Sequence, residues 1–276
     1  MSAIEVVTFD LWQTLIMDNR ELGRARTRRR LEGALEALTD AGYDFSYEQL
    51  QDAYRRCFRA CRVIHNQEKD VTFDEQVTMF IDNIDEGLSQ RLDSQVGDRI
   101  SWWYAEAFFD YPAPIVPEAY RMLEEVASMG YRLGMISNTG QTPGRLFRRY
   151  LAQLHILDFF QVLTFSDEVK LCKPSVEMFH MTLEALGTTP DRAVHLGDHI
   201  ANDIVGGNRA GMKTVLLGTV ESGDQIASDI VGGNRAGTAE AVAGPGEAED
   251  SAATPHLQIQ SLEEFPQVLG DSSLFT

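Results

Sequence analysis

Between residues 117 and 217 the chain alternates short apolar segments with segments of helical spacing, and this alternation constrains its fold more than any other feature. The apolar, β-rich runs lie at residues 131–136, 161–165, 193–196 and 214–217. The stretches between them have helical patterns. Such alternation is typical of a parallel sheet whose crossover helices cover both faces. We therefore predict an α/β fold.

A further strand-like run at residues 4–10 comes before this region and ends at Asp10. The following residues, 18–109, show helical spacing and almost no strand signal. Ser46 and Thr72 each stand three residues before a Gln or a Glu, the pattern of a capping box at a helix start. We expect four helices here, inserted as a cap over the strand ends. The expected domains are a core of residues 1–17 and 110–276 and a cap of residues 18–109.

One segment of the chain occurs twice. The sequence GDHIANDIVGGNRAG at residues 197–211 recurs with two changes as GDQIASDIVGGNRAG at residues 223–237. Only the first copy has strand-like runs on both sides. We expect residues 218–255, which are rich in Gly, Ala, Ser and acids, to form a flexible loop, and we interpret the second copy as a duplicate without function. The alternative is a second metal site at Asp224 and Asp229.

The composition limits the partners of this protein. Forty-two acidic residues against 24 basic ones give a net charge of −18, which would repel nucleic acid. The sequence shows no basic leader followed by an apolar segment and no apolar run long enough to span a membrane. We expect a cytoplasmic monomer or homodimer with reduced cysteines and no membrane or nucleic-acid partner.

Polar residues follow the predicted strands at several points. Parallel strands bring their carboxyl ends to one edge of the sheet, so we expect these side chains to meet there. Converging carboxylates repel each other unless a cation neutralises them, and oxygen ligands of this kind suit Mg²⁺. Taken singly, each of these residues could equally be a turn residue or a helix cap. The residues are Asp10, Ser137, Asn138, Lys173, Asp198 and Asp203.

In this arrangement Asp10 can attack an electrophile and form a covalent ester that water later hydrolyses. Ser137 and Asn138 offer a hydroxyl and an amide to the oxygens of a substrate. Lys173 supplies a positive charge that orients Asp10 and offsets charge in the transition state. The residues thus point to a hydrolase acting on a small anionic molecule.

The chain resembles the haloacid dehalogenase (HAD) superfamily, in the subgroup with a helical cap after the first motif. The sequence FDLWQTL at residues 9–15 resembles the first motif, ISNT at 136–139 the second, Lys173-Pro174 the third, and LGD at 196–198 with Asp203 the fourth. The resemblance implies a Rossmann-like core and Asp10 as the nucleophile.

The same resemblance implies roles for individual residues. Mg²⁺ would be bound by Asp10, Asp198 and Asp203 and by the backbone carbonyl of Trp12. Lys173 would be catalytic. The substrate-binding residues would be Thr14, Ser137 and Asn138.

Trp12 departs from the pattern of the family's phosphatases, which carry an Asp at this position to protonate the leaving group and activate water. The family's dehalogenases carry an aromatic residue there and work without metal, which makes a 2-haloacid dehalogenase the alternative. Asp198 and Asp203, however, retain the metal-binding form of the phosphatases. We therefore favour a Mg²⁺-dependent phosphatase acting on a phosphate ester. A catalytically weak protein that binds a small anion is a further alternative.

Six arginines between residues 20 and 30 form the remaining signal in the cap. Such a cluster is commonly a solvated helix face. The functional alternative is that one or two of them bind a carboxylate or phosphate of the substrate. Arg24 and Arg28 are four residues apart and share a helix face, so we select this pair as the substrate-binding arginines.

Overall fold

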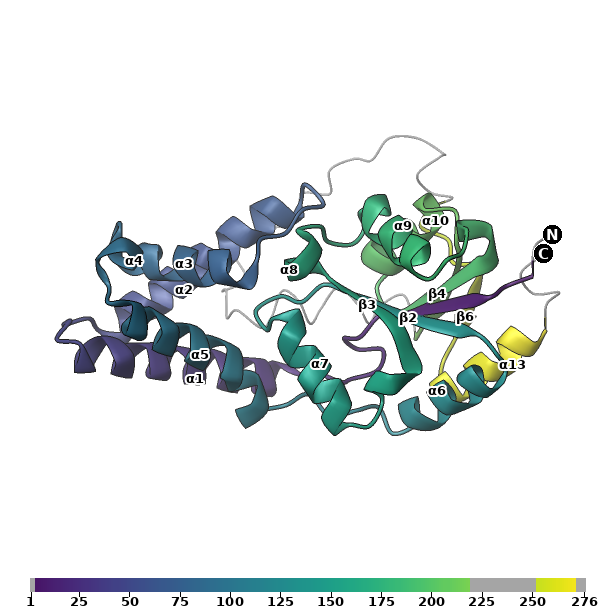
Figure 1. Cartoon of the computed structure of the whole chain (residues 1–276), viewed down its shortest axis with the longest axis horizontal. Coiled ribbons are helices and arrows are strands. Elements are labelled where there is room, and N and C mark those ends of the chain that lie inside the picture. Colours follow the sequence, from purple (N-terminus) through teal and green to yellow (C-terminus); the bar gives the residue numbers. More distant parts are fainter. Residues whose placement is uncertain (1–2, 219–251, 272–276) are drawn as a thin grey trace.

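The computed structural model describes residues 3–218 and 252–271. Within these residues lies a six-stranded sheet with the order β3-β2-β1-β4-β5-β6, and all of its strand pairs are parallel (Figure 1). The predicted parallel α/β sheet is therefore confirmed. The strands are β1 (Val6–Phe9), β2 (Arg132–Ser137), β3 (Phe160–Phe165), β4 (Ala193–Gly197), β5 (Lys213–Leu217) and β6 (Leu257–Ile259).

Helices cover both faces of the sheet. Because side chains alternate along a strand, Val7 and Phe9 of β1 pack with α6, α7 and α13 on one face, whereas Val6 packs with α9 and with the end of α10 at Ala210 on the other. The helices of the core are α6 (Ala119–Ser128), α7 (Gly144–Gln153), α8 (Ser166–Val169), α9 (Val176–Ala185), α10 (Val205–Arg209) and α13 (Phe265–Gly270), with a π-helical turn η3 (Ile200–Ile204) before α10. Short 3-10 turns are η1 (Leu157–Phe159), η2 (Pro190–Arg192) and η4 (Leu262–Glu264).

Strand β1 lies at the centre of the sheet, between β2 and β4. After β1 the sheet grows outward through β2 and β3, and the chain then returns to β4 on the other side of β1. Such a reversal of strand order leaves a crevice at the carboxyl ends of the strands, where α/β proteins bind ligands. Phe9 pairs with Leu196, so β1 and β4 end level with each other at this crevice.

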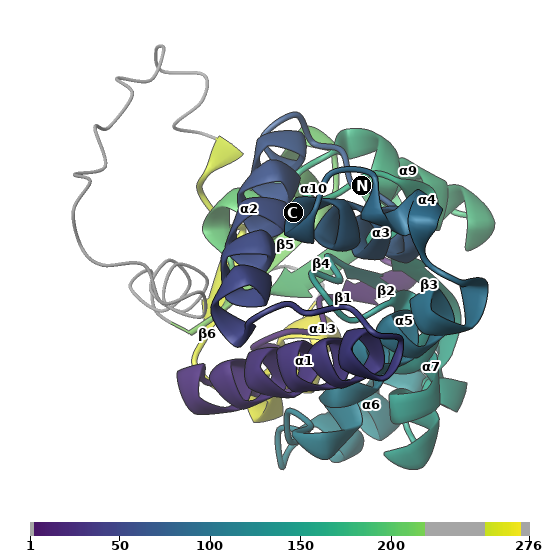
Figure 2. The same ribbon diagram turned by 90° about the vertical axis from the view of Figure 1, so that its left-hand side faces the viewer.

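The cap follows β1 and lies over the carboxyl ends of the strands (Figure 2). The capping boxes predicted at Ser46 and Thr72 are present. The expected helix over residues 89–109 is instead divided, because Asp93 accepts a hydrogen bond from the backbone N–H of Gln95 and starts a new helix. The cap helices, all within the described residues, are α1 (Arg20–Asp40), α2 (Tyr47–His65), α3 (Phe73–Ile84), the one-turn α4 (Leu88–Arg91) and α5 (Ser94–Asp110).

The two chain segments that join the cap to the core pair with each other. Ile16 forms an antiparallel bridge with Ile115, and the N–H of Met17 donates to the carbonyl of Pro114 at 2.8 Å. The cap has its own hydrophobic cluster, which Leu146 of α7 joins from the core. The paired segments thus fix the base of the cap next to the end of β1.

The duplicated segment 223–237, with Asp224 and Asp229, lies outside the described residues. In the part of the chain that the structure describes, no helix is both long and apolar enough to cross a membrane.

The close packing of Gly33 of α1 against Trp103 of α5 generates a prediction about the cap. A Cβ atom on Gly33 would lie 2.3 Å from Cγ of Trp103, an atom anchored to the backbone of α5. We expect Gly33→Ala to destabilise the protein by about 1–3 kcal/mol through overpacking, despite the higher helix propensity of Ala. Urea unfolding monitored by circular dichroism measures the change.

Gly97→Ala is the matched control, because a Cβ atom at Gly97 of α5 would meet no atom within 4 Å. This variant should keep its stability or gain up to about 1 kcal/mol from helix propensity. Equal unfolding midpoints for the two variants would contradict the packing argument.

Candidate active site

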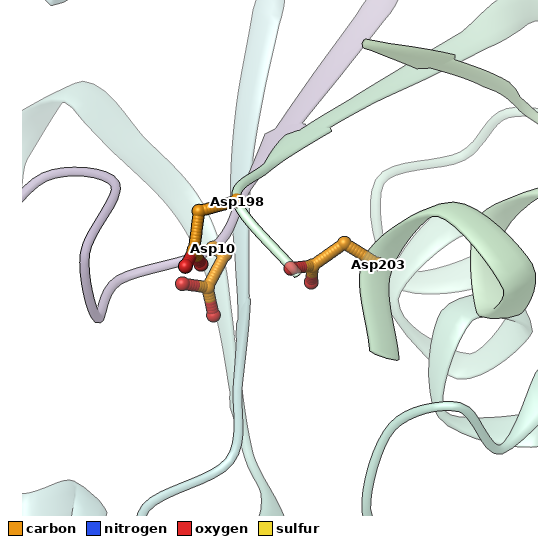
Figure 3. A group of neighbouring side chains, drawn as sticks. All are labelled: Asp10, Asp198 and Asp203. Carbon is orange, nitrogen blue, oxygen red and sulfur yellow. The ribbon is translucent and has the colours of Figure 1, made fainter. Parts of the chain in front are cut away.

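Asp10 and Asp198 stand side by side at the ends of two neighbouring strands. The N–H of Asp10 donates to the carbonyl of Leu196 at 2.9 Å, which extends the pairing of β1 and β4 by one residue. Figure 3 shows the two carboxylates beside each other, with Asp203 reaching toward them from the following helical segment. One oxygen atom from each of the three acids lies within 4.8 Å of the others. The convergence predicted from the sequence is present.

Asp203 reaches the other two acids by crossing Gly197. A Cβ atom at Gly197 would lie 2.3 Å from Cγ of Asp203, so any larger residue at the end of β4 would displace this carboxylate. The N–H of His199 donates to Oδ2 of Asp203 at 3.0 Å. The first turn of η3 therefore holds Asp203 over the end of β4.

The ammonium group of Lys173 lies between two of the carboxylates. Its Nζ is 2.5 Å from Oδ1 of Asp10 and 2.6 Å from Oδ1 of Asp203, and all three side chains are almost fully buried. Asn138 holds the backbone of Lys173 in both directions: its Oδ1 accepts from the Lys173 N–H at 2.8 Å, and its Nδ2 donates to the Lys173 carbonyl at 3.2 Å. Lys170, by contrast, forms an exposed ion pair with Glu75.

Burial and charge act differently on the three acids. Burial raises the pKa of Asp10 to about 6, although the positive charge of Lys173 opposes it. Burial and the charges of Asp10 and Asp203 raise the pKa of Asp198 to about 8. Burial acts in the same direction on Asp203, but Lys173 and the hydrogen bond from His195 outweigh it and hold the pKa of Asp203 below its ordinary value.

These shifts reflect burial first and the close approach of like charges second. The negative charges of Asp10 and Asp203 outweigh burial and raise the pKa of Lys173 above its ordinary value, so Lys173 stays protonated. When all three carboxylates are ionised, the one ammonium group leaves two negative charges without a counter-charge among these four groups. A divalent cation would supply that charge, and the all-oxygen donor set suits Mg²⁺.

His195 supports Asp203 from inside the sheet. It is fully buried in β4, its Nδ1 is 2.8 Å from Oγ1 of Thr8, and its Nε2 is 3.1 Å from Oδ1 of Asp203. Burial lowers the pKa of His195 and keeps the ring neutral. Its position in a strand indicates a core residue, and only its position two residues before Gly197 could have suggested this additional role.

The acids open into a cavity of about 340 Å³ between core and cap. This volume lies at the lower end of the range for small-molecule sites. The core contributes Asp10, Asn138, Lys173, Asp198 and Asp203 among others, and the cap contributes Arg26, Thr27, Arg30, Tyr54, Phe58 and His65. Ser137 and Thr14, both predicted to bind substrate, are fully buried and do not line this cavity. They belong to the layer behind it.

Trp12 lies at the junction of the cavity, the cap and the core. Its ring packs edge-on against Phe108 of α5 and Phe147 of α7, with centroid distances of 6.1 and 5.3 Å respectively. The guanidinium of Arg26 lies 5.8 Å from the centre of the indole. Position 12 thus contributes packing, and the indole N–H is a donor that cannot accept a proton. Its backbone carbonyl remains a predicted metal ligand.

The structure does not bring Arg24 and Arg28, the pair selected from the sequence, to the cavity. Both are exposed, and neither lines the cavity. Arg26 and Arg30, which lie on another face of α1, are 4% exposed and do line it. The sequence contained a signal for this pair, because they share a helix face with the small residues Gly33 and Ala34, which pack against the rest of the cap.

The two buried arginines differ in their partners. Arg26 forms an ion pair with Asp18 and donates to the carbonyl of Tyr111 at 2.9 Å. Arg30 donates to the carbonyl of Tyr104 at 2.8 Å, to the carbonyl of Gln141 at 3.2 Å and to Oγ1 of Thr142 at 3.1 Å. Among the described residues, no carboxylate forms an ion pair with Arg30. Its hydrogen-bond partners are two backbone carbonyls and a hydroxyl, all of them uncharged.

The parallel sheet, the inserted helical cap and the aspartate at the end of the first strand define a class of α/β hydrolases. Residues 4–211 match the haloacid dehalogenase-like hydrolases, and the chain belongs to this family. The chain is 28% identical over 216 residues to the glyceraldehyde 3-phosphate phosphatase of Methanothermobacter thermautotrophicus, a match that covers 78% of this chain and 85% of that protein.

Solved structures of both reaction types share the fold. A 2-haloacid dehalogenase from Pseudomonas syringae pv. Tomato DC3000 is similar with a TM-score of 0.64, at 20% identity and with 97% of this chain and 98% of that chain covered. A HAD phosphatase from Thermococcus onnurineus has a TM-score of 0.57, also at 20% identity and with the same coverage of 97% and 98%. At this identity the likeness concerns the fold and leaves the reaction open.

The position of Lys173 between two buried acids generates a stability prediction. Lys173→Met should leave Asp10 and Asp203 facing each other without a cation and destabilise the protein by about 3–5 kcal/mol. The measurement is urea unfolding in EDTA, so that no metal ion replaces the lost charge.

Lys170→Met is the control, because it removes an ion pair whose lysine side chain is 53% exposed. Solvent screens such a pair, and its loss should change stability by less than about 1 kcal/mol. If both variants lost the same amount, the buried ammonium group would not be the element that holds the acids together.

Proposed function

We propose that this protein is a Mg²⁺-dependent phosphatase that acts on a small organic phosphate. The observation that carries the proposal is the convergence of Asp10, Asp198 and Asp203 with more negative charge than Lys173 neutralises. Carbon–halogen hydrolysis by an aspartate needs no such excess of acids. Phosphoryl transfer benefits from a divalent cation at this position, because negative charge lies on the phosphoryl oxygens throughout the reaction.

The residues fit a magnesium ion. Asp10, Asp198 and Asp203 would hold it, with the backbone carbonyl of Trp12 as a further ligand. When bound, Mg²⁺ would neutralise the acids and the phosphoryl oxygens. A raised pKa for Asp198 is the expected state of an acid that awaits a cation, because burial and its acidic neighbours otherwise favour the neutral form.

The proposed reaction has two steps. First, an oxygen of Asp10 attacks the phosphorus atom, the bond from phosphorus to the ester oxygen breaks, and the alcohol leaves with an added proton. Second, water attacks the phosphorus of the aspartyl phosphate, loses a proton, and releases inorganic phosphate and the free Asp10 carboxylate. Lys173 holds Asp10 in place through both steps, and Asn138 holds Lys173.

The cavity favours a small substrate with a second polar or anionic group. Its volume of about 340 Å³ suits a molecule of a few carbon atoms with a phosphate. The related protein named glyceraldehyde 3-phosphate phosphatase supports this size. Arg30 supplies a buried positive charge on the cap side of the cavity, where it would bind the part of the substrate farthest from Asp10 or the phosphate itself.

Dehalogenation is the second candidate, and Trp12 is the observation that favours it. A halide leaves without a proton, so the reaction does not need the acid that is missing at position 12. This mechanism would use Asp10 and Lys173 and would not depend on a metal.

A panel of small phosphates and 2-haloacids, each with and without Mg²⁺, tests the function. We expect release of inorganic phosphate that stops in EDTA and returns with added Mg²⁺. Asp10→Asn should lower the rate by at least about 10³-fold, because it removes the nucleophile. Phosphate release in a malachite green assay and halide release in an ion-selective assay measure the two reactions.

The control is Asp158→Asn, which changes an exposed acid on the core and should leave the rate unchanged. Halide release in EDTA without any phosphate release would establish the dehalogenase instead. If neither product appears, the catalytically weak anion-binding protein is the remaining interpretation.

Arg30 generates a prediction about substrate affinity. Arg30→Met should raise KM for the phosphate substrate by about 10-fold to 100-fold, because a charge-assisted hydrogen bond in a buried site is lost. Arg28→Met, on the exposed face of the same helix, should leave KM within about twofold. Equal KM values for the two variants would show that Arg30 serves only to join α1 to the Gln141–Thr142 segment. Steady-state kinetics decides between these outcomes, and the melting temperatures of the two variants are compared to show that both are folded.

A further inference from the structure

The proposed phosphatase reaction lacks a group that can move a proton at position 12. The leaving alcohol needs a proton in the first step, and the attacking water must lose one in the second. The indole of Trp12 can do neither, and it packs against Phe108 and Phe147. Another side chain on the cavity must carry this proton if substrates with poor leaving groups are to react.

His65 is placed for this task. It is the last residue of α2 in the cap, and it lines the same cavity as Asp10 and Lys173. Its Nε2 lies 2.8 Å from Oδ1 of Asp70, a carboxylate whose side chain is 4% exposed, whereas the His65 side chain is 32% exposed. The contact with Asp70 leaves Nδ1 for a substrate or a water molecule. A histidine oriented by a buried carboxylate is a common arrangement for general acid–base catalysis.

The cap segment after His65 is joined to the segment that leads to Lys173. The N–H of Asp70 donates to the carbonyl of Lys170 at 3.0 Å, and the N–H of Cys172 donates to the carbonyl of Glu68 at 3.2 Å. Lys69 and Leu171 form an antiparallel bridge between these two bonds. The pairing of residues 68–70 with residues 170–172 thus ties the His65–Asp70 pair to the backbone of the catalytic lysine.

The surroundings of His65 favour its protonated form. Burial acts to lower the pKa of His65, but the hydrogen bond and charge of Asp70 outweigh it and raise the pKa above its ordinary value. Cys61 faces the ring from the same helix, and Cys172 of the core donates from its Sγ to the backbone carbonyl of His65 at 3.6 Å. The ring can therefore begin the reaction protonated and end the first step neutral.

Other titratable groups near the cavity are engaged elsewhere. His199 also lines it, but its Nδ1 accepts the N–H of Asn202 and caps η3. Asp18 forms the ion pair with Arg26. Asp167 accepts the N–H of Gly144 at 3.1 Å and does not line the cavity.

We propose that His65, oriented by Asp70, is the general acid and base that replaces the residue missing at position 12. This inference rests on the proposed phosphatase function. In the first step, protonated His65 gives its proton to the ester oxygen as the bond from phosphorus to that oxygen breaks and Asp10 bonds to phosphorus. In the second step, neutral His65 takes a proton from the water that attacks the aspartyl phosphate. Phosphate leaves, and free Asp10 and protonated His65 are restored.

The substrate class follows from this role. Alkyl phosphates have poor leaving groups and depend on the proton, so they are the substrates that this enzyme is equipped to hydrolyse. Aryl phosphates such as 4-nitrophenyl phosphate release a stable phenolate anion. They should therefore react in the first step without a proton from His65.

The test compares His65→Gln with wild type on glycerol phosphate and on 4-nitrophenyl phosphate, in Mg²⁺. The glutamine keeps a donor for Asp70 and cannot transfer a proton. We expect kcat/KM for glycerol phosphate to fall about 100-fold or more and kcat/KM for the aryl ester to change less than about threefold. Because the second step slows, the variant should also release one equivalent of 4-nitrophenol in a rapid burst before slow turnover.

His155→Gln is the matched control, since His155 is exposed on the core and lies away from the cavity lining. Asp70→Asn is a second variant that keeps the acceptor oxygen and removes the charge. In wild type, kcat/KM for glycerol phosphate should decline above a certain pH, where His65 loses its proton. In Asp70→Asn this decline should begin at a pH lower by about one unit or more, because the lost charge lowers the pKa of His65. If the role of Asp70 were purely structural, the pH at which kcat/KM declines would not change.

If wild type is active and His65→Gln lowers kcat/KM equally for both esters, or lowers it for neither, the role of His65 is overturned. The phosphatase function is left intact. A wild type that releases no phosphate from either ester with Mg²⁺ would refute the proposed function, and this inference with it. A melting temperature of His65→Gln close to that of wild type excludes misfolding as the cause.

Discussion

The ammonium group of Lys173, placed between the buried carboxylates of Asp10 and Asp203, is the interaction on which the rest of the site depends. Two buried carboxylates this close to each other can both stay ionised only beside a cation. The neighbouring positions of β1 and β4 bring Asp10 and Asp198 together, Gly197 leaves room for Asp203, and Asn138 holds the backbone of Lys173. Each of these features holds a charged group of the site in place, and the net charge of the site remains negative after Lys173 is counted.

Trp12 connects this site to the cap. At the position where the resemblance to phosphatases leads one to expect an aspartate, this tryptophan packs between a cap helix and a core helix. The cap in turn places Arg30 and His65 on the cavity and is tied to the core at its base and at residues 68–70. Polar functions that position 12 cannot supply are therefore available from the cap, provided that it stays closed over the strand ends.

The fold and the acids of the site were predictable, whereas most of the cavity wall was not. Strand-like runs ending in polar residues lead to one edge of a parallel sheet, so the meeting of Asp10, Asp198 and Lys173 follows from local patterns. The sequence pointed to Arg24 and Arg28, whereas Arg26 and Arg30 line the cavity, because helical spacing groups residues by face without showing which face meets the core. Ser137 and Thr14 stand in the expected motifs, but the depth of a side chain below a cavity depends on the packing of distant segments.

The sequence by itself determined the parallel sheet, the inserted helical cap and the order in which the acids and the lysine arrive at the sheet edge, because strand and helix periodicity and strand-end polarity are local properties. Only the tertiary structure decided that Arg26 and Arg30 face the cavity, that His195 supports Asp203, and that His65, paired with Asp70, lines the same cavity as Asp10. The cavity joins cap and core residues that are far apart in the chain, and no local pattern encodes how the cap lies on the core.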